Sequence, residues 1–125
     1  VERGGGDAAG LADGGGLMPI PTVRITGTIY LPGAVVAAHC EVRARLSQPG
    51  VVNDGSADQR IGGTAVAHAD ANGAVDFDLV PNDAITPSGT HYVVDYKAAS
   101  GATWKETWDL PSTPDPTEIG DIPAP

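Results

Sequence analysis

Hydrophobic and polar residues alternate in short runs along the middle of the chain. The first run, residues 22–29, places Val23, Ile25 and Ile29 on one side of a strand and polar residues on the other. Further runs of this kind occupy residues 35–46, 64–69, 75–79, 91–97 and 103–110. Because successive side chains of a strand point to opposite faces, each run predicts a strand with one buried face.

Turn-forming residues separate these runs. Pro32-Gly33 follows the first run, and Asn72-Gly73 is the strongest signal for a short hairpin in the chain. Residues 48–63 are polar, and we expect them to form an exposed loop. No segment has apolar residues spaced as on one face of a helix. The sequence therefore predicts an all-β chain, folded as an antiparallel β-sandwich of six or seven strands.

The two ends of the chain differ from this middle. Residues 1–21 contain two Gly-Gly-Gly triplets, and residues 112–125 are rich in proline. Neither segment is expected to bury enough apolar surface to offset the loss of conformational entropy on ordering. We predict a flexible N-terminal arm (1–21), a β-sandwich domain (22–111) and an extended C-terminal tail (112–125). The apolar residues with which these two arms would hold a partner are Leu11, Leu17, Met18, Ile20, Ile119 and Ile122.

The charge of the chain narrows the class of partner. It has 7 Lys and Arg against 16 Asp and Glu, a formal net charge of −9. Binding to phosphates requires clustered basic residues, so nucleic acid is excluded as the expected partner, and a basic protein surface is favoured. No apolar run approaches the about 18–20 residues that span a bilayer, and no secretory signal opens the sequence. We expect a protein made in the cytoplasm that does not bind membranes.

Residues capable of catalysis or metal binding are few and scattered. His39, His68 and His91 fall in three different predicted strands, and no cysteine pair accompanies them. Cys40 is the single cysteine, and the adjacent His39 would point to the opposite face of the strand. Asp70 opens a segment similar to a calcium loop, but the acidic residue required at the twelfth position is missing, which favours a plain turn. We expect no enzyme activity, no metal and no cofactor.

Alternation places Trp104, Glu106 and Trp108 on one side of the last predicted strand. The favoured interpretation is that both tryptophans pack in the core. The alternative is that they are surface aromatic residues that bind a partner or a sugar. For Glu106, a partly exposed position or a basic partner, Arg43 or Lys97, is favoured over a second carboxylate such as Asp95, which a glycosidase would require.

Residues 25–122 resemble small β-domains of tail-fibre and other minor structural proteins of tailed phages. The motifs that carry this resemblance are ITGTIYLPG, ADANGAVDFDLVPNDAITPSGTHYVVDY, a final strand with tryptophan, and a closing LPS…EIGDI. The first half is also similar to prealbumin-type domains. The resemblance implies an Ig-like or prealbumin-like sandwich. The chain lacks the long shaft of a tail fibre, and in this respect it is similar to capsid decoration proteins, which carry a flexible arm.

The combined expectation is a phage virion structural protein that is made in the host cytoplasm and carries no catalytic site. We favour a capsid decoration protein that binds the shell through its arms. The expected partners are other virion proteins, either the major capsid protein or tail proteins, and a homo-oligomer such as a trimer fits a symmetric shell. The alternatives are a tail-fibre or baseplate attachment module and a carbohydrate-binding adhesion domain.

Overall fold

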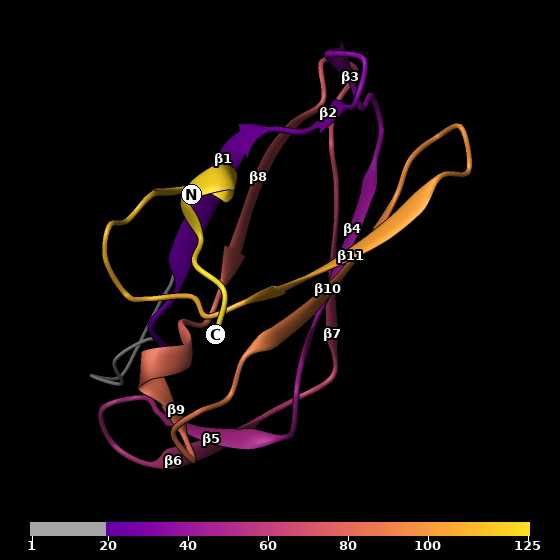
Figure 1. Ribbon diagram of the computed structural model, residues 1–125. Coiled ribbons are helices and arrows are strands. Elements are labelled where there is room, and N and C mark those ends of the chain that lie inside the picture. Colours follow the sequence, from indigo (N-terminus) through magenta and orange to yellow (C-terminus); the bar gives the residue numbers. More distant parts are fainter. Residues whose placement is uncertain (1–19) are drawn as a thin grey trace, which may run out of the picture.

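Two facing β-sheets make up most of the structure, a computed structural model that describes residues 20–125 (Figure 1). One sheet has three strands, in the order β12 (Thr117–Glu118), β1 (Val23–Thr28) and β8 (Ala74–Leu79). The other has four strands, in the order β11 (Thr103–Trp108), β10 (Tyr92–Lys97), β4 (Glu41–Leu46) and β7 (Thr64–His68). The prediction of an all-β sandwich is confirmed.

Two small sheets extend this sandwich. The hairpin of β2 (Tyr30–Leu31) and β3 (Val35–Val36) lies at the top of Figure 1. A three-stranded sheet at the bottom has the order β6 (Asp58–Ile61), β5 (Gly50–Asn53) and β9 (Ile85–Thr86). Two short 3-10 helices complete the described chain, η1 (Asn82–Ala84) and η2 (Ile119–Asp121).

The alternation read from the sequence selects the residues of the core. Tyr92, Val94 and Tyr96 of β10 are buried, and their partners on β4, from Leu46 to Val42, are buried as well. From the facing sheet, Ile25 is completely buried. The core therefore lies between the two sheets, and the intervening charged residues of each strand face outward.

Two local predictions differ from the structure. Residues 48–63 are not a single loop, because Gly50–Asn53 and Asp58–Ile61 pair as an antiparallel hairpin. The first three residues of β6 are polar and exposed, and only Ile61 is half-buried, so the sequence lacks the apolar alternation of a strand. The run 35–46 is also interrupted between β3 and β4, where His39 has a φ of 58°. Cys40 follows directly and is completely buried.

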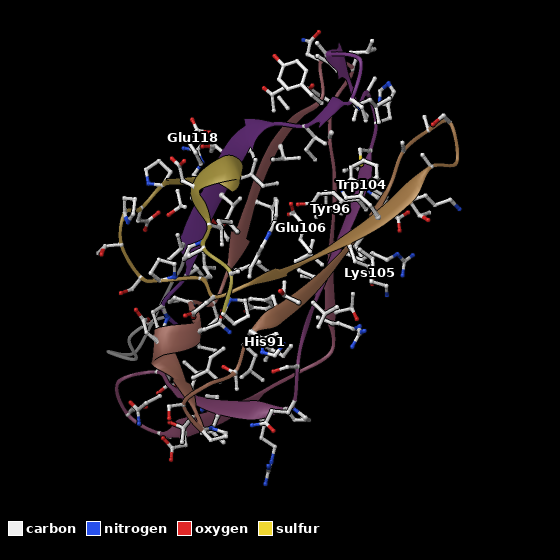
Figure 2. The ribbon with its side chains drawn as sticks, in the orientation of Figure 1. His91, Tyr96, Trp104, Lys105, Glu106 and Glu118 are labelled. Carbon is white, nitrogen blue, oxygen red and sulfur yellow. The ribbon has the colours of Figure 1, made fainter. Side chains whose placement is uncertain are left out.

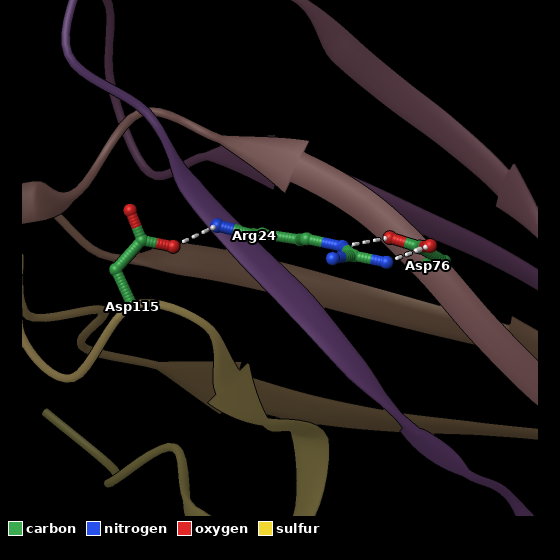
Figure 3. Close-up of polar contacts among 3 residues, drawn as sticks. All are labelled: Arg24, Asp76 and Asp115. Atoms are coloured by element: carbon green, nitrogen blue, oxygen red, sulfur yellow. Dashed lines mark hydrogen bonds and ion pairs between the residues drawn. The ribbon is translucent and has the colours of Figure 1, made fainter.

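The C-terminal segment is part of the domain, so the prediction of a separate tail over residues 112–125 is wrong. β12 adds to β1 as a parallel strand, with Ile25 opposite Thr117. The backbone N–H of Arg24 also donates to Asp115 at 3.0 Å, while the Arg24 guanidinium binds Asp76 of β8 through two hydrogen bonds (Figure 3). These contacts fix the segment along the outer edge of β1.

Apolar packing holds the same segment from the inside. Thr117 is buried, and Ile119 and Ile122 pack against the core. The Cγ2 atom of Ile119 would lie 2.7 Å from a Cβ placed on Gly27, whose φ is 137°. Glycine is therefore required at this position by both space and backbone conformation. Ile119 and Ile122 therefore pack against their own domain and do not lie on a free arm.

Candidate functional site

A cleft opens between the two sheets along β11. It has a volume of about 170 Å³. One wall comes from the end of β1, from β2 and from η2, and the other from β10 and β11. The residues that line it are Thr28, Ile29, Tyr30, Tyr96, Trp104, Glu106, Ile119 and Gly120. β11 is the outermost strand of its sheet, so the cleft lies at an edge of the sandwich.

Glu106 projects into this cleft from an inward position of β11. It lies opposite Val94, which is completely buried, so the register places the carboxylate on the core side of the sheet. Figure 2 shows Glu106, Tyr96 and Trp104 on the side of β11 that faces β1, and Lys105 on the other side. Glu106 therefore occupies a position at which the alternation of β11 predicts an apolar residue. Because β11 is at the edge of its sheet, the carboxylate remains in contact with solvent.

Two hydrogen bonds fix the orientation of the Glu106 carboxylate. The hydroxyl of Tyr96 donates to Oε1 at 2.6 Å, and Nε1–H of Trp108 donates to the same oxygen at 3.0 Å. In the chain from residue 20 onward, no hydrogen bond reaches Oε2 and no Lys or Arg forms an ion pair with this carboxylate. One oxygen is therefore saturated, and the other is available to a ligand.

Trp104 forms the wall beside this carboxylate. Its ring stacks on Tyr96 with a centroid distance of 5.0 Å and an interplanar angle of 11°. The side chain is half-buried, and it also lines a second, apolar hollow of about 440 Å³ together with Tyr30, Leu31, Pro32 and Ala102. Because Tyr30 and Trp104 belong to both hollows, an aromatic surface continues from the cleft to the β2–β3 hairpin.

The two tryptophans have different roles. Trp108 is 2% exposed and belongs to the core, as the favoured interpretation predicted. It is therefore not a surface aromatic residue, and no exposed face joins it to Trp104. Trp104 retains exposed ring surface at the mouth of the cleft. Burial, together with the hydrogen bond to Glu106, raises the pKa of the Tyr96 hydroxyl far above its ordinary value, so this group remains a neutral donor.

Among residues 20–125, Glu106 is the only carboxylate that lines the cleft. Asp95 is on the outward face of β10, opposite Lys105, and forms an ion pair with it at 3.0 Å. Arg43 pairs with Glu41 on that same outward face and does not reach Glu106. Glu106 is exposed, as one branch of the favoured interpretation predicted, and within residues 20–125 it pairs with neither a basic side chain nor the second acid that a glycosidase needs.

Cys40, His39 and His68 are close together along β4 and β7 but differ in exposure. Cys40 is buried, and burial raises the pKa of its thiol, which keeps it in the unreactive neutral form. His39 is exposed, and His68 lies 3.7 Å from a carboxylate oxygen of Glu41 on the outer face. Within residues 20–125, no group of three His, Cys, Asp or Glu side chains is placed to hold a metal ion.

The acidic segment similar to a calcium loop is a turn, and so is the segment that begins at Asp54. Oδ1 of Asp70 accepts hydrogen bonds from the backbone N–H groups of Asn72 and Ala74. Asp54 does the same for Ser56 and Ala57, and these bonds lower its pKa to about 2. In both cases the carboxylate is used to close its own turn.

The remaining predicted anchors belong to the N-terminal arm. Leu11, Leu17 and Met18 lie outside the described residues. Ile20 is exposed at 38%, and Tyr30, Val35 and Val66 are further apolar side chains with exposed surface. Sequence reasoning placed Glu106 beside the tryptophans but missed the cleft, because the opposite wall comes from β2 and η2, which are distant in sequence.

Two comparisons of the sequence with known proteins find no relative. A scan against models of protein families finds no match, and a search of curated proteins finds no matching sequence. Among residues 20–125, no helix is both long and apolar enough to cross a membrane.

Proposed function

We propose that this chain is an accessory structural protein of a tailed-phage virion, most specifically a capsid decoration protein that binds the outer surface of the shell. Two observations support the proposal. The sequence motifs resemble domains of such proteins, and the sandwich presents an aromatic cleft beside an unpaired edge strand. The cleft is the observation that carries it, because aromatic side chains at a sheet edge are typical of protein-binding surfaces. Attachment to a tail fibre or baseplate is the alternative within the same class.

The proposed mechanism is attachment at many equivalent positions on a symmetric shell. The major capsid protein is the expected partner, and each chain uses its open β11 edge together with the N-terminal arm. A trimer about local three-fold axes would join three such contacts into one unit. The net charge of −9 directs the protein to basic areas of the partner surface. The sequence predicted attachment through two free arms. The β11 edge takes the place of the C-terminal arm in this mechanism, because the C-terminal segment belongs to the sandwich.

Co-sedimentation with virions tests this function. Particles released by cells that encode the chain are purified on a density gradient, and the chain is sought in them by mass spectrometry. We expect it in many copies per particle, and its absence would contradict the proposal. Purified chain lacking residues 1–19 should melt at the same temperature as the intact chain but bind stripped particles more weakly. Unchanged binding would remove the arm from the mechanism.

A carbohydrate-binding adhesion domain is the second candidate. The stack of Trp104 on Tyr96 beside a carboxylate favours it, because sugars bind on aromatic rings with acidic hydrogen-bond acceptors nearby. The burial of Trp108 leaves a single exposed tryptophan ring for this purpose. Glycan arrays that compare the intact chain with Trp104→Ala separate this candidate from the first.

A further inference from the structure

We propose that the cleft along β11 receives a lysine or arginine side chain from a partner segment that lies beside this strand as an added strand. The inference rests on the proposed protein-binding function and names the chemistry of the partner. It starts from the carboxylate of Glu106, whose Oε1 accepts two hydrogen bonds while Oε2 accepts none from residues 20–125. An oriented carboxylate with one available oxygen is a ready acceptor for a charged donor.

The surroundings of the carboxylate favour a cation. Within the described part of the chain, the ion pairs bind Lys105 to Asp95 and Arg43 to Glu41 on the outer face of the sheet. Glu106 is on the inner face and has no such partner there. The net charge of −9 does not attract a neutral sugar. A basic side chain is attracted by it, which speeds its association and strengthens its binding.

Trp104 supplies the second contact for a basic side chain. Its ring borders the same cleft, and a Lys or Arg head group placed within about 6 Å of an aromatic ring is attracted to its face. The aliphatic stem of that side chain would lie against Tyr30 and Ile119, which line the opposite wall. A charged head and an apolar stem therefore match the two kinds of surface in the cleft.

The edge of β11 explains how a partner segment reaches the cleft. Within residues 20–125, β11 pairs with β10 on one side only, so its other edge carries backbone groups that no described strand pairs with. The backbone N–H of Asp109, just past the strand, donates to the carbonyl of Pro123 and closes that end. The preceding part of β11 is open to an added strand. Alternate side chains of that strand would enter the cleft and the apolar hollow beside Tyr30, Leu31 and Pro32.

The test compares a charged pentapeptide with its uncharged isostere. The probes are acetylated and amidated Thr-Val-Arg-Val-Thr and the same peptide with citrulline at the centre. Binding is followed by NMR through the indole N–H signals of Trp104 and Trp108 and the backbone amides of β11. We expect saturable shifts of Trp104 and β11 with the arginine peptide, weakened by salt, and binding about tenfold weaker with citrulline.

Glu106→Gln is the decisive variant. Its side-chain oxygen still accepts the hydrogen bonds of Tyr96 and Trp108, so the fold is retained while the charge is lost. We expect it to bind the arginine peptide about tenfold more weakly. The matched control is Asp95→Asn, which removes a carboxylate from the outer face of the adjacent strand and should leave binding unchanged. Equal binding of the two peptides, or equal binding by Glu106→Gln, would overturn the proposal.

Three further outcomes test the partner's chemistry and separate this site from the proposed function. Shifts of Trp104 with N-acetylglucosamine or galactose, but with neither peptide, would overturn the basic partner and identify a sugar site. If Glu106→Gln loses the arginine peptide yet co-sediments with virions as the intact chain does, the cleft is not the surface that binds the shell and the proposal falls while the virion function stands. If the intact chain binds the peptide as described but is absent from virions, the site stands and the virion function falls.

Discussion

A chain that lacks residues 112–125 is expected to lose much of its stability. Removing this segment uncovers the outer edge of β1 and takes away the packing of Ile119 and Ile122. It also leaves backbone groups of Ile25 and Thr26 without their parallel partner strand. The lost apolar burial and hydrogen bonds together correspond to about 4 kcal/mol of the free energy of unfolding. The midpoint of thermal unfolding, followed by circular dichroism, should fall by about 15 °C.

Point variants in the same segment provide the control for this truncation. Ile119→Ala removes a side chain that packs on the core and approaches Gly27, and it should account for part of the loss. Glu118→Ala changes an exposed residue next to it and should leave the melting temperature nearly unchanged. A truncated chain that melts with the intact one would show that residues 112–125 are a free tail after all.

Trp108→Ala is expected to be the most destabilising single substitution. The side chain is 2% exposed, and its Nε1–H donates to Glu106. Loss of a buried tryptophan leaves a large cavity and costs about 3–5 kcal/mol. Urea unfolding, monitored by the fluorescence of the remaining tryptophan, measures this change in the free energy of unfolding. The midpoint should fall while the denaturant dependence is preserved.

Trp104→Ala is the matched control, because it removes the same side chain from the same face of the same strand. Trp104 is only partly buried, at the mouth of the cleft, so we expect a loss of about 1–2 kcal/mol. Equal losses for the two variants, or a larger one for Trp104→Ala, would contradict the assignment of Trp108 to the core and of Trp104 to the cleft.

Local alternation was sufficient to predict the main strands and one half of the site. The runs around Ile25, Val42, Val75 and Val94 have the period of a half-buried strand, and the structure buries these residues. The same rule placed Glu106 on the face of Trp104 and Trp108. Both predictions depend only on which face of its own strand each side chain occupies. The alternation in a single sequence is enough to show this.

The features that were missed depend on contacts between distant segments. Residues 112–125 contain too many prolines to suggest a strand, yet two residues, Thr117 and Glu118, are enough to pair with β1. The position of Ile119 on Gly27 fixes them there, and nothing near either residue in the sequence indicates this contact. The cleft has the same origin, because Glu106 meets the β2 hairpin and η2 only after the chain has folded.

The central claim is that this sandwich functions by placing the open edge of β11 and the Glu106 cleft against another protein. A cryo-electron microscopy map of the virion in which we propose that the chain sits tests it most directly. The account predicts the sandwich on the particle surface, with β11 beside a strand of the neighbouring subunit and a lysine or arginine of that subunit next to Glu106 and Trp104. A map in which the β11 edge faces solvent, and the opposite edge at β7 makes the contact, would contradict it.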